Sequence, residues 1–319
     1  MKKGTTNWNL KEIFTMKSIN IMDREISIVI NTDTRPGIGT GRTVAHGGRG
    51  ARSWDFLIDN VYVCRHFFEQ AHSVEVILLV DVHEPIPPTV MSKLHQMFEE
   101  GIIDNLVFRR SVRFYEGRSI EQWKGLFYLE ALYMAKGKYV AHFDGDSSAF
   151  RDPDSSIVED LIAWVESGDY DFVSYPSPNS PYPDPLGSMH MIRADYVWVS
   201  TRFFFCKRDI LDSTEMMNCT LDAETGYIRK NYSQYYGKFF THPGVLEQIL
   251  GMMVSTRMNR VFYPLRSEDN DHFIFSWHTY YDGTLSKLRN MEWSQVKHYL
   301  DECGGVQGPC DLHDAGVLI

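Results

Sequence analysis

The chain has 319 residues, of which 43% are apolar and 23% are charged, a composition typical of a globular protein and not of a disordered one. Its formal net charge of −10 argues against nucleic acid as the main partner, because binding to phosphates needs a basic surface. The longest strongly apolar segment, at 74–80, is far shorter than the ~20 residues that a membrane-spanning helix requires. The sequence therefore predicts no transmembrane segment.

Two further features bear on the compartment. No apolar stretch follows the lysines at the N-terminus, so the sequence shows no secretory signal. The five cysteines are an odd number without CxxC spacing, which is typical of free thiols in a reducing compartment and not of disulfides or a zinc site. We expect a cytoplasmic protein, either free or peripheral to a membrane.

After an N-terminal extension at 1–24, strands and helices are predicted in alternation. In chain order they are strand 25–32, helix 53–71, strand 74–82, helix 87–101, strand 105–111, helix 120–135 and strand 139–143. The strands are short and apolar, whereas the helices repeat apolar residues at i, i+3 and i+4 spacing. This alternation predicts βαβ units and an α/β fold, with a mainly parallel, Rossmann-type sheet flanked by helices.

The second half of the chain is less regular. A helix with Ser155 or Ser156 near its start and then a strand are predicted before residue 175. The Pro- and Ser-rich segment 177–188 is expected to be a surface loop, and 198–211 a strand that runs into the start of a helix. A helix leading to a strand is predicted within 241–265, and the tail beyond it is dense in histidine, aspartate and aromatic residues.

Acidic and polar residues end the predicted parallel strands. Thr32 and Asp33 follow the first strand, Asp81 ends the second, and Asp144 and Asp146 follow the fourth. Ligands of parallel sheets bind at the carboxyl ends of the strands. Two carboxylates one residue apart suit a divalent cation that prefers oxygen ligands, although an acidic turn is the alternative. The pattern therefore favours a nucleotide-type site at this edge.

The segment AKGKYVAHFDGDSS at 135–148 resembles the A-x-G-x-Y, strand and D-x-D segment of family-2-like glycosyltransferases with the GT-A fold. SIVINT and VEVILLVD resemble the first two strands of that family, so the resemblance covers roughly residues 25–150. It implies a GT-A-like sheet and a nucleotide-diphospho-sugar donor, linked to UDP or GDP. Where the family carries two adjacent acids after its second strand, this chain has Asp81 followed by Val82, which leaves the identity of the base open.

The resemblance also implies roles for the acids at the strand ends. Thr32, Asp33 and Asp81 would lie near the base or the ribose. Asp144 would lie beside the donor and, together with Asp146, hold Mn²⁺ or Mg²⁺. It implies that 25–150 is the nucleotide-sugar-binding half and 151–265 the acceptor-binding half of one domain. The segment 266–319 would then lie over the active site.

Residues in the less similar half complete the expected site. Glu247 matches the pattern around the catalytic base of related inverting enzymes, because Leu250 and VFYP at 261–264 follow it. Asp269 is the alternative candidate for the catalytic base. Such a carboxylate takes the proton from the hydroxyl of a glycan or another acceptor. The resemblance also implies a third metal ligand, commonly a histidine, from the C-terminal segment. His278 is the candidate, with a histidine packed among aromatic residues as the alternative.

Several features allow more than one interpretation. Arg118 and Lys124 either contact the donor or belong to a solvated face of the helix. The Gly-rich stretch 36–52 matches neither phosphate-binding fingerprint, so it is either a mobile surface loop or a loop that closes over the diphosphate through an arginine. A sugar-1-phosphate nucleotidyltransferase and a non-catalytic module that binds nucleotide sugars or glycans are the alternative functions.

Overall fold

The computed structural model describes most of the sheet and the helices that cover it. The described residues are 25–33, 54–69, 72–82, 85–109, 130–145, 147–174, 199, 202–211, 250, 260–262, 273–277 and 288–302. The strands are β1 (Ile26–Asp33), β2 (Val74–Asp81), β3 (Asn105–Arg109), β4 (Tyr139–Asp144), β5 (Ser147–Arg151), β6 (Tyr170–Ser174), β7 (Phe203–Lys207), β8 (Arg260–Phe262) and β9 (Phe273–Trp277). The helices are α3 (Trp54–Glu69), α4 (Pro88–Glu99), α6 (Ile157–Glu166), α7 (Arg208–Leu211) and α12 (Trp293–Glu302).

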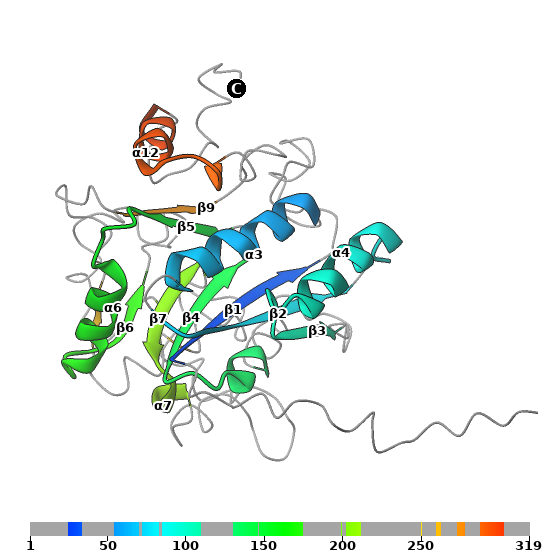
Figure 1. The fold of residues 1–319 in the computed structure, drawn as a ribbon. Helices are drawn as coiled ribbons and strands as arrows, with labels where there is room; N and C mark the ends of the chain where they lie inside the picture. Colours follow the sequence, from blue (N-terminus) through cyan, green and yellow to red (C-terminus); the bar gives the residue numbers. More distant parts are fainter. Residues whose placement is uncertain are drawn as a thin grey trace, which may run out of the picture.

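The main sheet has seven strands in the order β3-β2-β1-β4-β7-β6-β8 (Figure 1). Neighbours are parallel from β3 through β4 and again between β6 and β8. β7 is antiparallel to both of its neighbours, β4 and β6. The structure thus confirms the predicted α/β fold with a mainly parallel sheet flanked by helices.

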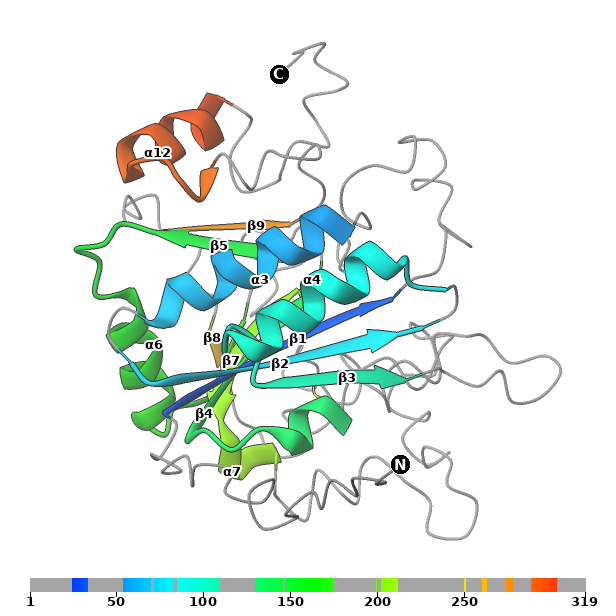
Figure 2. The same cartoon turned by 45° about the vertical axis from the view of Figure 1, so that its right-hand side comes forward.

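A two-stranded antiparallel sheet, formed by β5 and β9, lies on the far side of α3 from the main sheet (Figure 2). Neither of its strands was predicted, because the sequence favours a cation site, or alternatively an acidic turn, directly after β4, and no strand was assigned within the aromatic-rich tail. Helix α12, also not predicted, lies beyond this small sheet in the same view. Phe56 and Val63 of α3 form one buried cluster with Phe150, Leu288 and Val296. This cluster attaches the C-terminal segment to the outer surface of α3.

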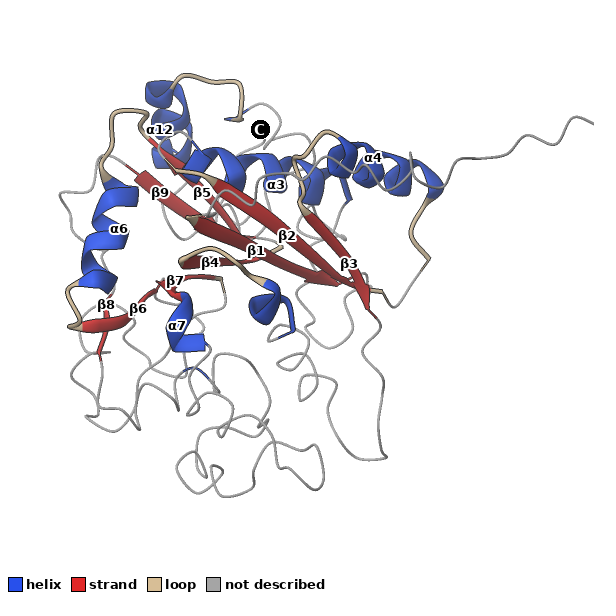
Figure 3. Ribbon diagram, turned by 60° about the horizontal axis from the view of Figure 1, so that its bottom comes forward, coloured by secondary structure: helices blue, strands red, loops and turns tan. Residues whose placement is uncertain are grey.

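Helices cover both faces of the main sheet (Figure 3). One face packs against α3, α4 and α6. The other face packs against α7 and the short helical stretch at 130–134. All eight residues of β2 are buried, which is the reason why this strand appears in the sequence as a continuous apolar run. None of the described helices combines the length and the apolar character needed to cross a membrane.

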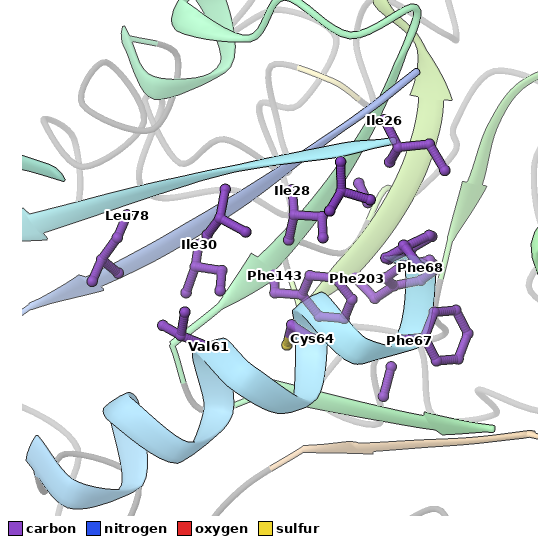
Figure 4. Close-up of a cluster of buried hydrophobic side chains, with 14 of the residues drawn as sticks. Ile26, Ile28, Ile30, Val61, Cys64, Phe67, Phe68, Leu78, Phe143 and Phe203 are labelled. Atoms are coloured by element: carbon purple, nitrogen blue, oxygen red, sulfur yellow. The ribbon is translucent and has the colours of Figure 1, made fainter. Parts of the chain in front are cut away.

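The larger core lies between the sheet and α3 (Figure 4). Ile26, Ile28 and Ile30 of β1 alternate toward this face, as the two-residue period of a strand requires. They meet Val61 and Phe68, which belong to the buried stripe of α3. Because this core fixes α3 against β1 and β4, polar residues in the same stripe of α3 are also held in defined positions.

The A-x-G-x-Y segment lies at the amino ends of the strands, away from the predicted site. The N–H of Gly137 donates to the Ser27 hydroxyl (2.7 Å), and the N–H of Lys136 donates to Glu75 Oε1 (2.6 Å). A Cβ at Gly137 would come within 2.6 Å of the Ser27 nitrogen, so no larger residue fits without a shift of the backbone. In this chain the glycine therefore serves to pack the entry of β4 against β1.

The start of α6 lies where it was predicted, directly after Ser155 and Ser156. Ser156 is the N-cap residue, but its side chain makes no capping hydrogen bond. The N–H of Ile157 instead donates to Ser155 Oγ (3.2 Å), while Ser156 Oγ donates to the Asp160 carboxylate (3.1 Å).

Candidate functional site

The strand register brings the predicted acidic residues to one edge of the sheet. Asp33 at the end of β1 is paired with Asp81 at the end of β2. Asp144 at the end of β4 is paired with Asn31 of β1, two positions before Asp33. By strand alternation, Asp81 and Asp144 lie on the face that Leu79 and His142 also share. The edge and its order are therefore as predicted for these acids.

Exposure differs between the residues of this edge. Asp81 is only 2% exposed, whereas Thr32 and Asp144 are half-buried. Asp144 thus combines a fixed backbone with a side chain that remains partly accessible. An oxygen donor of this kind fits a hard divalent cation such as Mg²⁺ or Mn²⁺.

The turn after Asp144 is packed closely against β1. The N–H of Gly145 donates to the carbonyl oxygen of Asn31 (2.7 Å). A Cβ at this position would lie 2.6 Å from Thr32 Cβ and 2.7 Å from Thr32 Oγ1. Glycine is thus the residue that allows the chain to leave β4 directly beside β1.

Asn60 of α3, which the sequence analysis missed, contacts the same turn. Its Nδ2 donates to the carbonyl oxygens of Gly145 (3.2 Å) and Ser147 (3.0 Å). Ser148 Oγ donates to Asn60 Oδ1 (2.5 Å). The signal in the sequence was a polar residue inside the apolar stripe of a helix, where Leu57, Asn60 and Cys64 follow helical spacing.

A second buried polar pair joins β1 and β4, where His142 lies two residues before Asp144. Asn31 Nδ2 and His142 Nε2 are 2.6 Å apart, and both side chains are at most 1% exposed. If Nδ2 donates, then Nε2 accepts, which puts the proton of a neutral imidazole on Nδ1. The ring of His142 stacks on Phe204 with 4.8 Å between ring centroids and 3° between planes. This pair supports β1 and β4 directly behind Asp144.

Arg109 is another residue of this edge that the sequence analysis did not select. It ends β3 in register with Asp81. Its Nε and Nη2 both donate to Glu130 Oε1, at 2.9 and 2.7 Å. This hydrogen-bonded carboxylate raises the pKa of the guanidinium, so Arg109 stays charged and its charge is balanced within the protein.

The other predicted site residues lie outside the described residues. They are Arg118, Lys124, Asp146, Glu247, Asp269 and His278, together with the Gly-rich stretch 36–52. Within the described part of the chain, no group of three or more histidine, cysteine or acidic side chains could hold a metal ion. Because two of the three expected metal ligands are outside that part, the ligand set stays a prediction.

No protein-family model matches the sequence, and no curated protein matches it either. Similar solved structures include a mannosyltransferase from Pyrobaculum calidifontis in complex with GDP-Man and Mn²⁺, with 14% identity, a TM-score of 0.39 and coverage of 76% of this chain. The galactosyltransferase LgtC, in complex with donor and acceptor sugar analogues, has 11% identity, a TM-score of 0.43 and coverage of 74% of this chain and 72% of that chain. The chain spans only 55% of the Pyrobaculum protein. At such identities and TM-scores, no activity of these proteins extends to this chain.

Proposed function

We propose that the chain is a metal-dependent glycosyltransferase, which transfers a sugar from a UDP- or GDP-linked donor to a hydroxyl group of a glycan or another acceptor. The observation that carries this proposal is the strand register. It aligns the carboxyl ends of β1, β2 and β4, and with them the acidic residues at these ends, along one edge of the sheet. Ligands of α/β proteins bind at this edge. A diphosphate bound beside several carboxylates needs a cation to offset the repulsion between negative charges.

Asp144 and Asp146 hold Mn²⁺ or Mg²⁺ in this proposal, and His278 is the third ligand. Ser147, the first residue of β5, is paired with Trp277, the last residue of β9. Asp146 and His278 are each one peptide bond away from this pair. Each of the two residues is thus the chain neighbour of a residue in one strand pair, and this connectivity supports a shared cation.

The cation, when bound, acts as a Lewis acid on the leaving diphosphate. The oxygen of the acceptor hydroxyl attacks the anomeric carbon, and the bond from that carbon to the diphosphate oxygen breaks. Glu247 takes the hydroxyl proton, with Asp269 as the alternative base. A single displacement of this kind inverts the configuration at the anomeric carbon.

The remaining predicted residues bind the donor. Thr32, Asp33 and Asp81 contact the base or the ribose, while Arg118 and Lys124 contact the phosphates. The proposal keeps the division of one domain into a donor half at 25–150 and an acceptor half at 151–265, with 266–319 over the active site.

The test is to incubate the protein with Mn²⁺ and a panel of UDP- and GDP-sugars, and to measure the release of nucleoside diphosphate. Asp144→Asn and Asp146→Asn are expected to lose at least ~100-fold in rate, because a Lewis acid contributes several kcal/mol. Asp154→Asn is the matched control, since Asp154 is an exposed acid shortly after β5. It is expected to keep the rate of the unchanged protein.

Two results would overturn the proposal. Formation of nucleoside triphosphate from a nucleotide sugar and pyrophosphate would identify a nucleotidyltransferase. A metal-dependent thermal shift with nucleotide sugars, without any turnover, would identify a binding module.

A further inference from the structure

We propose that Asn60 is a positioning residue, which holds the backbone on both sides of Asp146 and thereby sets the geometry of the cation site. This inference rests on the proposed function only in assigning the cation to Asp144 and Asp146. Asn60 itself belongs to α3 and contacts the turn between β4 and β5 through two backbone carbonyl groups. We assign it a positioning role and not a catalytic one, because its side chain is fully buried.

Both polar atoms of the Asn60 amide are hydrogen-bonded. Nδ2 donates to the carbonyl oxygens of Gly145 and Ser147, at 3.2 and 3.0 Å. Oδ1 accepts from Ser148 Oγ at 2.5 Å, and Cys64 Sγ lies 3.6 Å from both Oδ1 and the Ser147 carbonyl oxygen, of which its single proton serves one. A side-chain amide has two donors and two acceptor lone pairs, so this contact set fixes which way the amide points. Burial also raises the pKa of the Cys64 thiol, so that thiol stays protonated and able to donate.

The two carbonyl groups lie on either side of Asp146. One belongs to the peptide bond between Gly145 and Asp146, and the other follows Ser147. Gly145 is held from the opposite direction as well, because its N–H donates to the carbonyl oxygen of Asn31. The turn is therefore fastened to β1 through one hydrogen bond and to α3 through two.

Two buried carbonyl groups account for an amide at this place. The neighbouring positions of the stripe, Leu57, Val61 and Cys64, are filled by apolar side chains or a thiol. A polar group in such a stripe carries a desolvation cost, which is offset by the hydrogen bonds to the Gly145 and Ser147 carbonyl oxygens, two buried acceptors that need donors. By satisfying both acceptors, the amide also holds the two residues that flank Asp146 in the sequence, and a cation needs its ligands at defined distances.

The experiment compares Mn²⁺ affinity with stability. The affinity of the protein for Mn²⁺ alone is measured by electron paramagnetic resonance, and unfolding is measured with urea. Asn60→Asp keeps the shape but offers no donor to the two carbonyl groups, while Asn60→Ser is too short to reach both. We expect both variants to bind Mn²⁺ ~10–100-fold more weakly, the usual effect of losing a group that orients metal ligands.

Two control variants separate positioning from general destabilisation. Ser148→Ala removes one partner of Asn60 Oδ1 but leaves the two bonds to the carbonyl groups. Glu75→Gln perturbs a buried hydrogen-bond network at the opposite edge of the sheet. Both are expected to lower the stability toward urea while the dissociation constant for Mn²⁺ stays within about twofold.

The outcomes are distinct for the two proposals. If the unchanged protein does not bind Mn²⁺, the metal site of the proposed function is wrong. If it binds Mn²⁺ and a folded Asn60 variant binds equally well, Asn60 does not position the site. If the controls lose Mn²⁺ affinity in proportion to their stability, Asn60 is merely structural and the inference is also overturned. Should Asn60→Asp not fold, Asn60→Ser decides the question by the same criteria.

Discussion

Replacement of Gly145 by alanine tests the packing of the turn against β1. Among the described glycines only Gly101 and Gly168 have a positive φ, so the backbone of Gly145 itself would accept alanine. On that ground alone the substitution would stabilise the protein by ~0.4–1 kcal/mol, because it restricts the unfolded chain. The new Cβ, however, would lie 2.6 Å from Thr32 Cβ and 3.2 Å from the Asn31 carbonyl oxygen. Crowding of this kind costs ~1–3 kcal/mol, so the two effects have opposite signs.

We expect Gly145→Ala to lower the free energy of unfolding in urea by ~1–2 kcal/mol, the overpacking cost less the gain from the unfolded chain. Thr32→Gly removes the two side-chain atoms in the way, so a double-mutant cycle should show a favourable coupling between the two changes. Gly137→Ala is the matched control: its Cβ would meet Ser27 and Ile26 of β1 and not Thr32, so it should also destabilise the protein but show no coupling to Thr32→Gly. An increase in stability for Gly145→Ala would refute the reasoning.

Two further predictions concern pH. Hydrogen bonds from Lys138 and then Tyr139 lower the pKa of Glu166, so its contribution to stability is present above the ordinary pKa and is lost as pH falls through the folded-state value. Glu166→Gln should lower the free energy of unfolding in urea at pH 7 by at most ~1 kcal/mol for so exposed a pair, and the difference from the unchanged protein should vanish in acid. Desolvation is the largest influence on Asp59 and raises its pKa despite the nearby Arg289, so ionised Asp59 costs stability at neutral pH. Asp59→Asn should therefore be at least as stable toward urea as the unchanged protein at pH 7, and this advantage should disappear as pH falls toward the ordinary pKa. A clear loss of stability at pH 7 would contradict this account of the ion pair.

The main sheet could be predicted because its strands are buried on both faces. β2 is buried along its whole length, so its apolar run identifies it without knowledge of its neighbours. The predicted helices around it show the matching periodicity, as the buried stripe of α3 illustrates. Since parallel strands align their carboxyl ends, the common edge of Asp81 and Asp144 followed from the predicted parallel orientation, without knowledge of the strand order.

The small sheet could not be predicted in the same way. β5 begins with Ser147 and Ser148, which are polar yet buried. They are buried because β9, more than 120 residues later in the chain, pairs with them and because Asn60 contacts them. The residues next to a strand in the sequence do not indicate which distant segments will pair with it. The sequence of a short polar strand therefore resembles that of a turn. β9 itself has the sequence FIFSW, in which aromatic and β-branched residues favour a strand, and this was the available signal.

The position of Asn60 shows why the acidic residues alone do not define the candidate site. The turn after Asp144 is hydrogen-bonded to Asn31 in β1 and to Asn60 in α3. The buried apolar side chains of these two elements belong to the larger core. The outer surface of α3 also holds the C-terminal segment, through the cluster that Phe56 and Val63 share with Leu288. Small shifts of α3 would therefore move the turn and the C-terminal segment together, because packed cores resist deformation and transmit strain. The geometry of the site depends on how the core is packed, so substitutions that disturb α3 against β1 should alter cation binding even when they touch no acidic residue.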